Sequence, residues 1–482
     1  MNKSGVEVEG RSYEARSYGV LGAGLMRDLS SRISRGGHFG DARTARAVSG
    51  RAAFPNRDDP STSGHDLAGD PVPSGEFGAA SAAGQWEEPG DIVFKRPELS
   101  PLPGRELAAP ETRALVCAFA GGGTGGHIVP GVHVLAHMLR AGTQIAKVVW
   151  LGAGRGVEER VLDSARSLLG EIPLESISLG LEGGGGGAPS RLQILLRLVP
   201  AIQRARHALV ANRVDVLLGL GGASTAPACL AARWAGVPVC LLEINAKPGR
   251  ATRWLAPLAD KVLYAWPSSV PAKAPANHIV TGPPLAPAFL TGAPGPAEVH
   301  AARTAWGMDP TRPVLLILGG SQGALGINRF ARSWVPKFLA EGVQVLHQLG
   351  PGRRAEGAAD LQGYFPVEYI EDVAGVLATA TCVLCRGGAS TLAEVAARGR
   401  PAWVVPYPHH RDRHQEANAR ALGAGVHIVE ESNLGAGAFA GLVRLCRDEG
   451  AGDREAMSLA LRAAVPLDAG ERVMRALLTA RP

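Results

Sequence analysis

Hydrophobic and polar positions along this chain form two blocks in which apolar runs alternate with amphipathic segments. The first block opens with RALVCAFA, a glycine-rich stretch and an amphipathic segment, which predict a strand, a loop and a helix over 113–142. Further strands are predicted at 147–154, 173–180 and 214–220, and helices at 157–170 and 191–213, with a glycine-rich loop at 182–190. Strands that alternate with helices predict βαβ units and therefore a parallel sheet.

The second block begins near residue 313 and repeats this order of elements. A strand, a glycine loop and a helix are predicted over 313–342, and more strands and turns at 343–350, 366–372 and 382–391. Between the blocks, residues 281–302 are rich in proline and glycine, which predicts an interdomain linker.

The five letters GGAST occur once in each block, after an apolar run and before an alanine-rich segment. Together with the loop that opens each block they give four glycine-rich turns, at 121–126, 221–225, 319–323 and 387–391. Parallel sheets bind ligands beyond the carboxyl ends of their strands. We therefore expect an α/β protein with two Rossmann-like domains, 112–285 and 286–480, which face each other across a cleft lined by these turns. A C-terminal helix can pack back on the first domain.

Residues 1–111 lack the periodicity of both blocks. They are rich in Ser, Gly, Arg, Asp and Pro, and cannot bury enough apolar surface to offset the entropy of ordering. We predict a disordered, low-complexity tail, and its first residues have no signal-peptide core. No run of about 18 uncharged apolar residues occurs, so no transmembrane helix is expected.

Length and charge narrow the class of protein. A chain of 482 residues is too long for one ordinary core, and its net charge of +6 is compatible with anionic phosphates or an anionic membrane surface. The charge is weak and the aromatic content is 5%, so neither indicates nucleic-acid binding. The six cysteines mostly lie in apolar runs, which is typical of reduced thiols in a cytosolic protein. Cys382 and Cys385 form one CxxC without the second pair of a zinc site, so we expect a buried strand there.

The first glycine loop matches the dinucleotide fingerprint GxGxxG at Gly121, Gly123 and Gly126. A site for NAD also needs an acidic residue at the end of the second strand, and that strand ends VVWLGAGR. No GK[ST] follows, so the loop is not a P-loop. The remaining interpretation is a cradle of backbone amides for phosphate or a polar sugar.

Polar residues follow several of these turns. His127 stands where a helix is expected to begin, so its ring should face the cleft and stay neutral as a proton acceptor. His133 and His137 have metal-pair spacing without a nearby carboxylate, which favours surface histidines. Glu394 follows the second GGAST and can accept both hydroxyls of a ribose, or can be an ordinary helix-surface residue. The stretch 406–419 follows a predicted strand, and is either a solvated loop or a place where substrate hydroxyls bind.

Five sequence motifs of this chain occur in the same order in one known family. They are GGGTGGHIVPG (121–131), LLEINAKPGRATRWLA (241–256), GGSQGALGIN (319–328), LHQLG (346–350) and RGGASTLAEVAARGRPAWVVPYPHHRDRHQEANA (386–419). Over about 113–480 the sequence resembles the bacterial MurG glycosyltransferases. The resemblance implies a GT-B fold and transfer of N-acetylglucosamine from UDP-GlcNAc to the muramyl sugar of undecaprenyl-pyrophosphate-linked lipid I. The product, lipid II, serves peptidoglycan synthesis, and with it cell-wall biogenesis, cell shape and cell division.

The same resemblance implies roles for individual residues. The donor would be bound in the C-terminal half by Ser321 at the pyrophosphate, Ile370 at uracil through its backbone, Ala389, Ser390, Thr391, Leu392, Ala393 and Glu394 at the α-phosphate and ribose, and Gln415 at the sugar hydroxyls. Thr124, Gly125 and Gly126 would lie beside the reacting sugar, and Asn245 matches the family's Asn after its His-Glu-Gln.

The chain also departs from the family pattern. Leu242 and Ile244 stand where the family has His and Gln, and GPPLA (282–286) replaces a segment with an Asn and an Arg that serve the donor site. Gly387 follows Arg386 where Ser or Ala is usual. Donor binding can therefore differ, and Arg250 or Arg253 is a candidate to compensate.

The implied reaction is an inverting attack of the acceptor hydroxyl on C1 of the sugar, with His127 as the candidate general base. No cofactor is implied, and no DxD motif occurs in the predicted domains, which agrees with catalysis without a metal. The expected partners are UDP-GlcNAc, lipid I and the cytoplasmic face of the inner membrane, where the protein would be peripheral. No nucleic acid is expected.

Membrane contact has one candidate segment. The predicted helix at 191–213 places Leu192, Leu195, Leu196, Val199 and Ile202 near Arg191, Arg197, Arg204 and Arg206. A basic amphipathic helix can lie in an anionic interface, but the same pattern fits a helix packed on its own sheet. The lipid acceptor favours the membrane.

Three other functions stay open at this point. One is another UDP-sugar-dependent GT-B transferase, and a second is a UDP-sugar epimerase, which needs no acceptor. The third is a non-catalytic protein that binds a nucleotide sugar.

Overall fold

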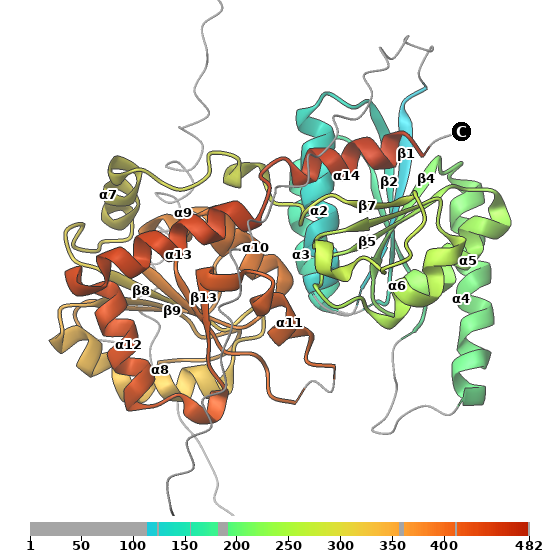
Figure 1. Ribbon diagram of the computed structural model, residues 1–482. Helices are drawn as coiled ribbons and strands as arrows, with labels where there is room; N and C mark the ends of the chain where they lie inside the picture. Colours follow the sequence, from blue (N-terminus) through green and yellow to red (C-terminus); the bar gives the residue numbers. More distant parts are fainter. Residues whose placement is uncertain are drawn as a thin grey trace, which may run out of the picture. The chain divides into compact units, whose positions relative to one another are not determined.

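The computed structural model describes residues 113–122, 125–154, 156–181, 191–355, 361–409 and 412–480. The predicted tail (1–111) and the predicted loop at 182–190 lie outside this part. Within it, two parallel sheets are each flanked by helices (Figure 1). The prediction of two Rossmann-like domains of the GT-B type is therefore confirmed.

The first sheet is built from the first block. In the described part of the chain its strands are β1 (Leu115–Gly121), β2 (Ile145–Gly152), β3 (Leu174–Ser178), β4 (Val216–Gly221), β5 (Val239–Glu243), β6 (Lys261–Tyr264) and β7 (His278–Val280). Its helices are α2 (Gly125–Arg140), α3 (Gly156–Leu169), α4 (Arg191–Ala211), α5 (Thr225–Ala235) and α6 (Arg250–Leu255).

The second sheet is built from the second block. Its described strands are β8 (Val314–Leu318), β9 (Gln344–Gln348), β10 (Tyr364–Val367), β11 (Cys382–Cys385), β12 (Ala402–Val404) and β13 (Val426–Ile428). The helices of this part are α7 (Pro296–Ala305), α8 (Leu325–Ala340), α9 (Val373–Thr379), α10 (Ala389–Ala397), α11 (His414–Arg420), α12 (Ala436–Cys446), α13 (Ala451–Ala464) and α14 (Ala469–Leu478).

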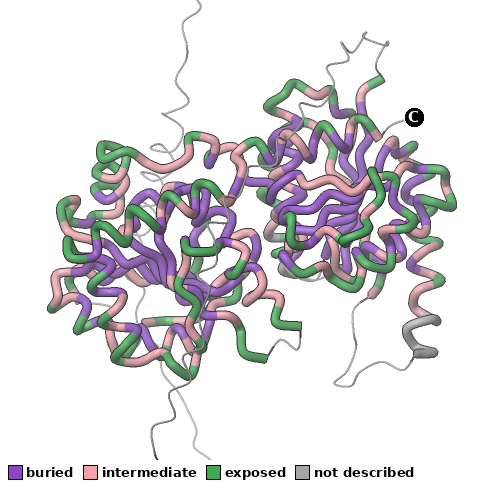
Figure 2. Tube along the Cα trace, viewed as in Figure 1, coloured by how far each residue is buried: buried purple, intermediate pink, exposed green. Residues whose placement is uncertain are grey.

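The strands are apolar on both faces because helices cover both faces. On β1, Cys117 and Phe119 pack with residues of α2, α3 and α14, whereas Ala118 and Ala120 pack with α4 and α5. Alternate residues of a strand point to opposite faces, so a continuous apolar run serves two cores at once. Figure 2 shows the resulting buried strands inside more exposed helices.

The glycine-rich turns lie at equivalent places in the two sheets. The strand orders are β3-β2-β1-β4-β5-β6-β7 and β10-β9-β8-β11-β12-β13, so the order reverses between β1 and β4 and between β8 and β11. The described residues of the turns at 121–126, 221–225, 319–323 and 387–391 lie at the carboxyl ends of these four strands. Ligands of open parallel sheets bind at such a switch point, at the carboxyl ends of the strands.

Some boundaries differ from the prediction. The strand expected at 366–372 is β10, which already ends at Val367. The stretch 281–302, expected as a linker, contains a short 3-10 turn (Pro287–Phe289) and most of α7. Pro296 is the first residue of α7, where the missing N–H of proline costs no helical hydrogen bond. The same proline that suggested a linker therefore starts a helix.

The C-terminal helix α14 packs on the first sheet. Val473 and Leu477 are buried in one core cluster with Phe119 and Met138, and the Nζ of Lys261 donates a hydrogen bond of 2.9 Å to the carbonyl of Ala476. Figure 1 shows α14 beside α2.

Candidate functional site

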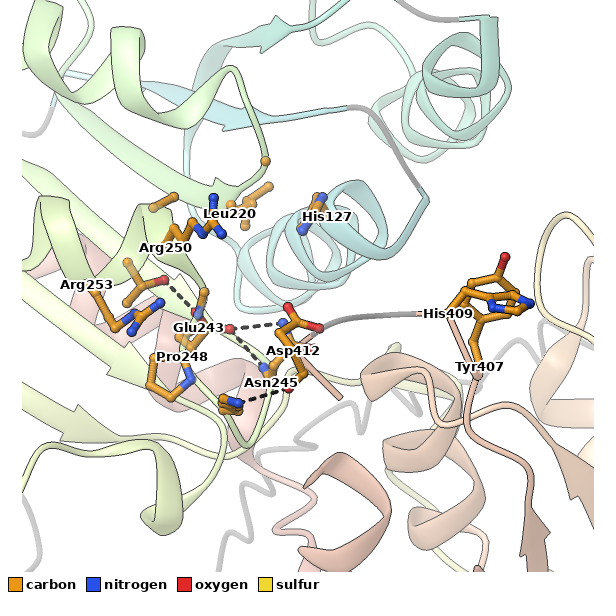
Figure 3. Close-up of a pocket in the computed structure, with 16 residues that line it drawn as sticks. His127, Leu220, Glu243, Asn245, Pro248, Arg250, Arg253, Tyr407, His409 and Asp412 are labelled. Atoms are coloured by element: carbon orange, nitrogen blue, oxygen red, sulfur yellow. Dashed lines mark hydrogen bonds between the residues drawn. The ribbon is translucent and has the colours of Figure 1, made fainter. Parts of the chain in front are cut away.

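A pocket of about 920 Å³ lies at the carboxyl ends of β4 and β5. Its lining includes His127 of α2, the turn after β4, the segment 243–253 after β5, and Tyr407, His409 and Asp412 from the second block. Figure 3 shows His127 and Arg250 reaching in from different elements, with Glu243 and Asn245 between α6 and Asp412. Two predicted site residues, His127 and Asn245, therefore line one pocket.

His127 is the third residue of α2 and is held against the first GGAST turn. A side chain at Gly222 would lie 3.2 Å from Nδ1 of His127 and 2.5 Å from the carbonyl oxygen of Gly122, and one at Gly221 would lie 3.1 Å from Cδ2 of the ring. Gly221 and Gly222 have φ of +96° and +82°, which glycine adopts at little cost. The paired glycines are thus required by the close approach of the two turns and the imidazole.

The electrostatic surroundings keep the His127 ring neutral. Burial lowers the pKa of His127 below 6.5, while a hydrogen bond to the Gly122 backbone and the charge of Glu243 act in the opposite direction. That bond favours the tautomer whose proton faces Gly122, so the other ring nitrogen carries the lone pair. Such a ring can take a proton from a substrate hydroxyl at neutral pH.

Glu243, the last residue of β5, organises the loop that follows it. One carboxylate oxygen accepts hydrogen bonds from the backbone N–H and the side-chain amide of Asn245, both at 3.0 Å. The other accepts from the backbone of Gly249 at 2.8 Å and from the hydroxyl of Thr252 at 2.6 Å. Four donors hold this buried carboxylate, so the 244–252 loop has a fixed shape around the pocket.

Asn418 of α11 joins this loop to the second GGAST turn. Its Oδ1 accepts from the backbone N–H of Ala246 at 2.8 Å, and its Nδ2 donates to Oδ1 of Asn245 at 3.2 Å and to the carbonyl of Gly387 at 3.1 Å. Asn418 is fully buried. One side-chain amide therefore connects the 244–252 loop of the first block with the 387–391 turn of the second.

Three basic side chains and two carboxylates, of Glu243 and Asp412, line the pocket. Arg250 and Arg253 of α6 are exposed and line it, as does Lys247, whose Nζ donates to the carbonyl of Asp412 at 2.9 Å. The two arginines are three residues apart and so lie on one face of α6. They are in the pocket that holds His127, which fits binding of a phosphate-bearing substrate there.

The predicted donor segment begins α10. Ala389 is buried in the core cluster of the first sheet, which places α10 beside α2. A side chain at Gly387 would lie 2.3 Å from the backbone carbonyl of Gln415, so this glycine lets the turn and α11 meet. The side-chain carbonyl of Gln415 accepts a 2.8 Å hydrogen bond from the backbone of Tyr407, a pocket residue.

Two polar side chains of α10 are largely removed from solvent. The buried hydroxyl of Ser390 has no hydrogen bond among the described residues. Glu394 is 8% exposed, and burial raises its pKa from 4.5 to about 8. The alternative of a helix-surface Glu is therefore wrong, because the carboxyl group faces the interior. The unpartnered hydroxyl of Ser390 suits the binding of a polar ligand that supplies a hydrogen bond.

The remaining predicted site residues lie in different environments. Ser321 is exposed in the turn between β8 and α8, and Gly320 and Gly323 have φ of +80° and +70° there. Ile370 is buried in the core of the second sheet, and Thr391 is half-buried. Gly125 and Gly126 begin α2, whereas Thr124 lies outside the described residues. Leu392 and Ala393 are buried in α10 and act as packing residues.

His133 and His137 are not on the surface, as the spacing had indicated, and that prediction is wrong. Nδ1 of His133 lies 3.0 Å from the carbonyl of Pro284, and Nε2 of His137 lies 2.9 Å from that of Leu285. Both histidines thus bind the backbone of the GPPLA segment. Side chains at i and i+4 share one helix face, and here that face meets a loop rather than solvent.

The predicted membrane helix corresponds to α4, and the side chains of its residues 191–196 are not described. Val199 is exposed, but Ile202 packs against the core of the first sheet, so its placement on a membrane face is wrong. Arg204 donates to the carbonyl of Leu179, and the guanidinium of Arg206 lies 4.7 Å from the centre of the Trp234 ring. One face of α4 therefore packs on its own sheet. Among the described helices, none has the length and apolar character needed to cross a bilayer.

Sequence reasoning missed two residues that shape the site. Glu243 is an acidic residue at the end of the apolar run VCLL, and that pattern could have identified it. Asn418 lies in a polar helix, and nothing in its local pattern distinguishes it from Gln415 or Glu416. Its role depends on partners about 170 residues away in the sequence.

Two models of known protein domains match this chain, one in each block. The model of the glycosyltransferase family 28 N-terminal domain matches residues 117–264, and that of the C-terminal domain matches 314–432. A curated relative from Frankia casuarinae is 36% identical over 324 residues, which are 66% of this chain and 83% of the relative. Its name is UDP-N-acetylglucosamine--N-acetylmuramyl-(pentapeptide) pyrophosphoryl-undecaprenol N-acetylglucosamine transferase.

Two solved structures share the fold. The crystal structure of Acinetobacter baumannii MurG is 24% identical with a TM-score of 0.56, and the match covers 76% of this chain and 100% of that one. The UDP-GlcNAc 2-epimerase from Neisseria meningitidis bound to UDP-GlcNAc is 15% identical with a TM-score of 0.53, over 76% and 100% of the two chains. A transferase and an epimerase thus share this fold, and the fold alone does not separate the two activities.

Proposed function

This chain belongs to glycosyltransferase family 28, and from that premise we propose that it transfers N-acetylglucosamine from UDP-GlcNAc to the muramyl sugar of undecaprenyl-pyrophosphate-linked lipid I. The product is lipid II for peptidoglycan synthesis. The observation that carries the proposal is the junction at Asn418, which brings the second GGAST turn to the pocket that contains His127. A donor at that turn and an acceptor in that pocket would be neighbours.

The donor binds to the second domain, which we place at 286–480. The N-terminal backbone of α10 and the hydroxyls of Ser321 and Ser390 face the pyrophosphate, since helix N-termini and unpartnered donors favour anions. The backbone of Ile370 binds uracil, and Glu394 accepts the two ribose hydroxyls. The side-chain amide of Gln415 binds hydroxyls of the sugar, in a position fixed by its bond to the Tyr407 backbone.

The acceptor binds to the first domain, which we place at 112–285, with its sugar at the turn 124–126 and Asn245. The lone-pair nitrogen of His127 removes the proton from the attacking hydroxyl as that oxygen forms its bond to C1 of N-acetylglucosamine. The bond from C1 to the UDP oxygen breaks with inversion at C1, and the electron pair leaves with UDP. The amide dipoles at the start of α10 stabilise the charge that develops on the diphosphate.

Two arginines of the pocket can replace a phosphate contact that is lost where the chain departs from the family pattern. Leu242 and Ile244 are buried and apolar, and Ala286 is too short to reach a phosphate. Arg250 and Arg253 supply positive charge in the pocket that holds His127. We therefore assign to these two arginines the phosphate contact that the GPPLA segment cannot make.

The protein acts at the cytoplasmic face of the inner membrane as a peripheral protein. Helices α4, α5 and α6 pack on one face of the first sheet, and Trp234 of α5 and Trp254 of α6 are 63% and 77% exposed. Exposed tryptophans beside Arg206 and Arg253 suit the interface of an anionic membrane, because the indole ring favours the headgroup region and the guanidinium binds phosphate.

One incubation separates the candidate functions. The protein is mixed with UDP-GlcNAc in the presence and absence of lipid I, and the products are separated by chromatography. Release of UDP that depends on lipid I supports the transferase. An epimerised nucleotide sugar without acceptor, or binding of UDP-GlcNAc without turnover in either mixture, contradicts it.

A further inference from the structure

A second cavity, of about 330 Å³, lies at the amino-terminal edge of the second sheet. It is lined by Thr381, which precedes β11, by Arg400, which precedes β12, and by residues of α7 and α13. The GGAST turn lies at the other end of β11 and of the nine-residue helix α10, whose length is about 13 Å. The cavity is therefore separate from the proposed donor site.

The cavity is lined by an excess of positive charge. The guanidinium groups of Arg303, Arg400 and Arg454 face it, and among the described lining residues Glu455 is the one carboxylate. Arg303 is 8% exposed. The lining therefore holds three cations and one anion, and of these Arg303 is buried while Glu455 is exposed.

Part of this charge has a structural role. Arg303 donates to the carbonyl of Thr379 at 2.9 Å and to the hydroxyl of Thr381 at 3.0 Å, and Arg400 donates to the carbonyls of Leu377 and Ala378 at 3.0 and 2.8 Å. These bonds cap the C-terminal end of α9, where a positive charge is favourable. Arg454 donates to the carbonyls of Leu445, at 2.9 Å, and of Arg447, both at the C-terminal end of α12, so all three guanidinium groups also hold the main chain.

The like charges act on one another. The pKa of Arg400 is lowered to about 10 by burial, and then by the positive charges of Arg303 and Arg398. Arg398 is paired with Glu298 at 3.1 Å, so that carboxylate is already engaged. The charges of Asp309 and Glu298 act in the opposite direction on Arg303 and Arg400, so the like charges are partly compensated.

We propose that this cavity binds a compact phosphate-bearing anion, a phosphate or diphosphate group, as an effector separate from the donor. Arginine has five N–H donors, so each guanidinium keeps N–H groups beyond those that bind main-chain carbonyls and Thr381, and its planar fork matches phosphate oxygens. The hydroxyls of Thr381 and Ser458 add donors to the lining. Gly399 and Arg400 continue directly from α10, so an anion here acts on the far end of the helix that carries Glu394.

The test is calorimetric titration of inorganic pyrophosphate into the full chain, with UDP at saturation to occupy the donor pocket. We expect one further binding site in the wild type. Arg454→Gln should weaken it about tenfold, because a charge-assisted contact to phosphate is lost. Glu455→Gln should strengthen it about threefold, since it removes the carboxylate that repels the anion.

The matched control is Arg444→Gln, which removes an arginine paired with Asp453 outside the cavity lining and should leave the affinity unchanged. Circular dichroism and urea unfolding verify that each variant is folded. The proposal is overturned if no pyrophosphate binds in the presence of UDP. It is also overturned if Arg454→Gln and Glu455→Gln bind as the wild type does, or if Arg444→Gln weakens binding equally. Because these variants lie away from the donor pocket, this result is independent of whether the proposed transferase activity is correct.

Discussion

Glu394 gives the most quantitative prediction about this protein. Its carboxyl group is 8% exposed in α10, and burial raises its pKa from 4.5 to about 8. Between pH 4.5 and about 8, the carboxyl group keeps its proton in the folded state but has released it in the unfolded state. Folding stability must therefore fall as pH rises through this interval, and the loss levels off above pH 8.

The magnitude follows from the two pKa values. A carboxyl group whose pKa rises from 4.5 to about 8 contributes on the order of 5 kcal/mol to the difference in free energy of unfolding between pH 4 and pH 9. Glu394→Gln removes the titration and keeps the shape of the side chain. We expect the variant to match the wild type at pH 4.5 and to exceed it by several kcal/mol at pH 9.

The assay is urea unfolding of both proteins at five pH values between 4.5 and 9. Glu371→Gln serves as the control, because it removes an exposed carboxyl group just before α9 and should follow the wild-type profile. If the stability difference between Glu394→Gln and the wild type is the same at pH 4.5 and pH 9, the carboxyl group is not buried as described.

The same group links pH to donor binding. If Glu394 accepts two ribose hydroxyls, it binds as the carboxylate, so UDP binding near pH 7 must release a proton. Calorimetry in two buffers with different ionisation enthalpies measures that release. The affinity for UDP should rise up to tenfold per pH unit below pH 8, and this dependence should disappear in Glu394→Gln. A pH-independent affinity in the wild type would exclude the ribose contact.

Three further predictions concern the site and the membrane face. His127→Ala should lower turnover by about two to four orders of magnitude with UDP affinity retained, and near-wild-type turnover would remove the ring from the chemistry. Asn418→Asp replaces the donating amide by a carboxylate oxygen, so it should lower the free energy of unfolding in urea by roughly 1–3 kcal/mol and kcat/KM about tenfold. Unchanged values would contradict the role of Asn418 in joining Asn245 to the turn at Gly387. Replacing Trp234 and Trp254 by Ser should reduce co-sedimentation with anionic vesicles, whereas Leu459→Ser, an equally exposed change in α13, should not; equal binding by all variants would place the membrane contact elsewhere.

Local sequence patterns were sufficient for the framework. Apolar runs, glycine turns and helical segments predicted two parallel sheets, because hydrophobic periodicity acts within a few residues of each position. The four glycine-rich turns and the position of His127 at the start of a helix followed from the same patterns. The predicted extents of β10 and of the linker before β8 were wrong, and for α7 the reason is that proline is compatible with both a linker and a helix start.

Tertiary structure alone decided which polar groups are buried and what they contact. The side chain of Asn418 forms hydrogen bonds with Asn245 and Gly387. His133 and His137 bind the backbone carbonyls of Pro284 and Leu285. The carboxyl group of Glu394 is buried away from solvent. Each of these outcomes depends on segments that lie far apart in the sequence; Ala246 and Asn418, for example, are 172 positions apart. A residue's own neighbours fix whether it is helical, but hydrogen bonding and desolvation depend on what the whole chain brings to it.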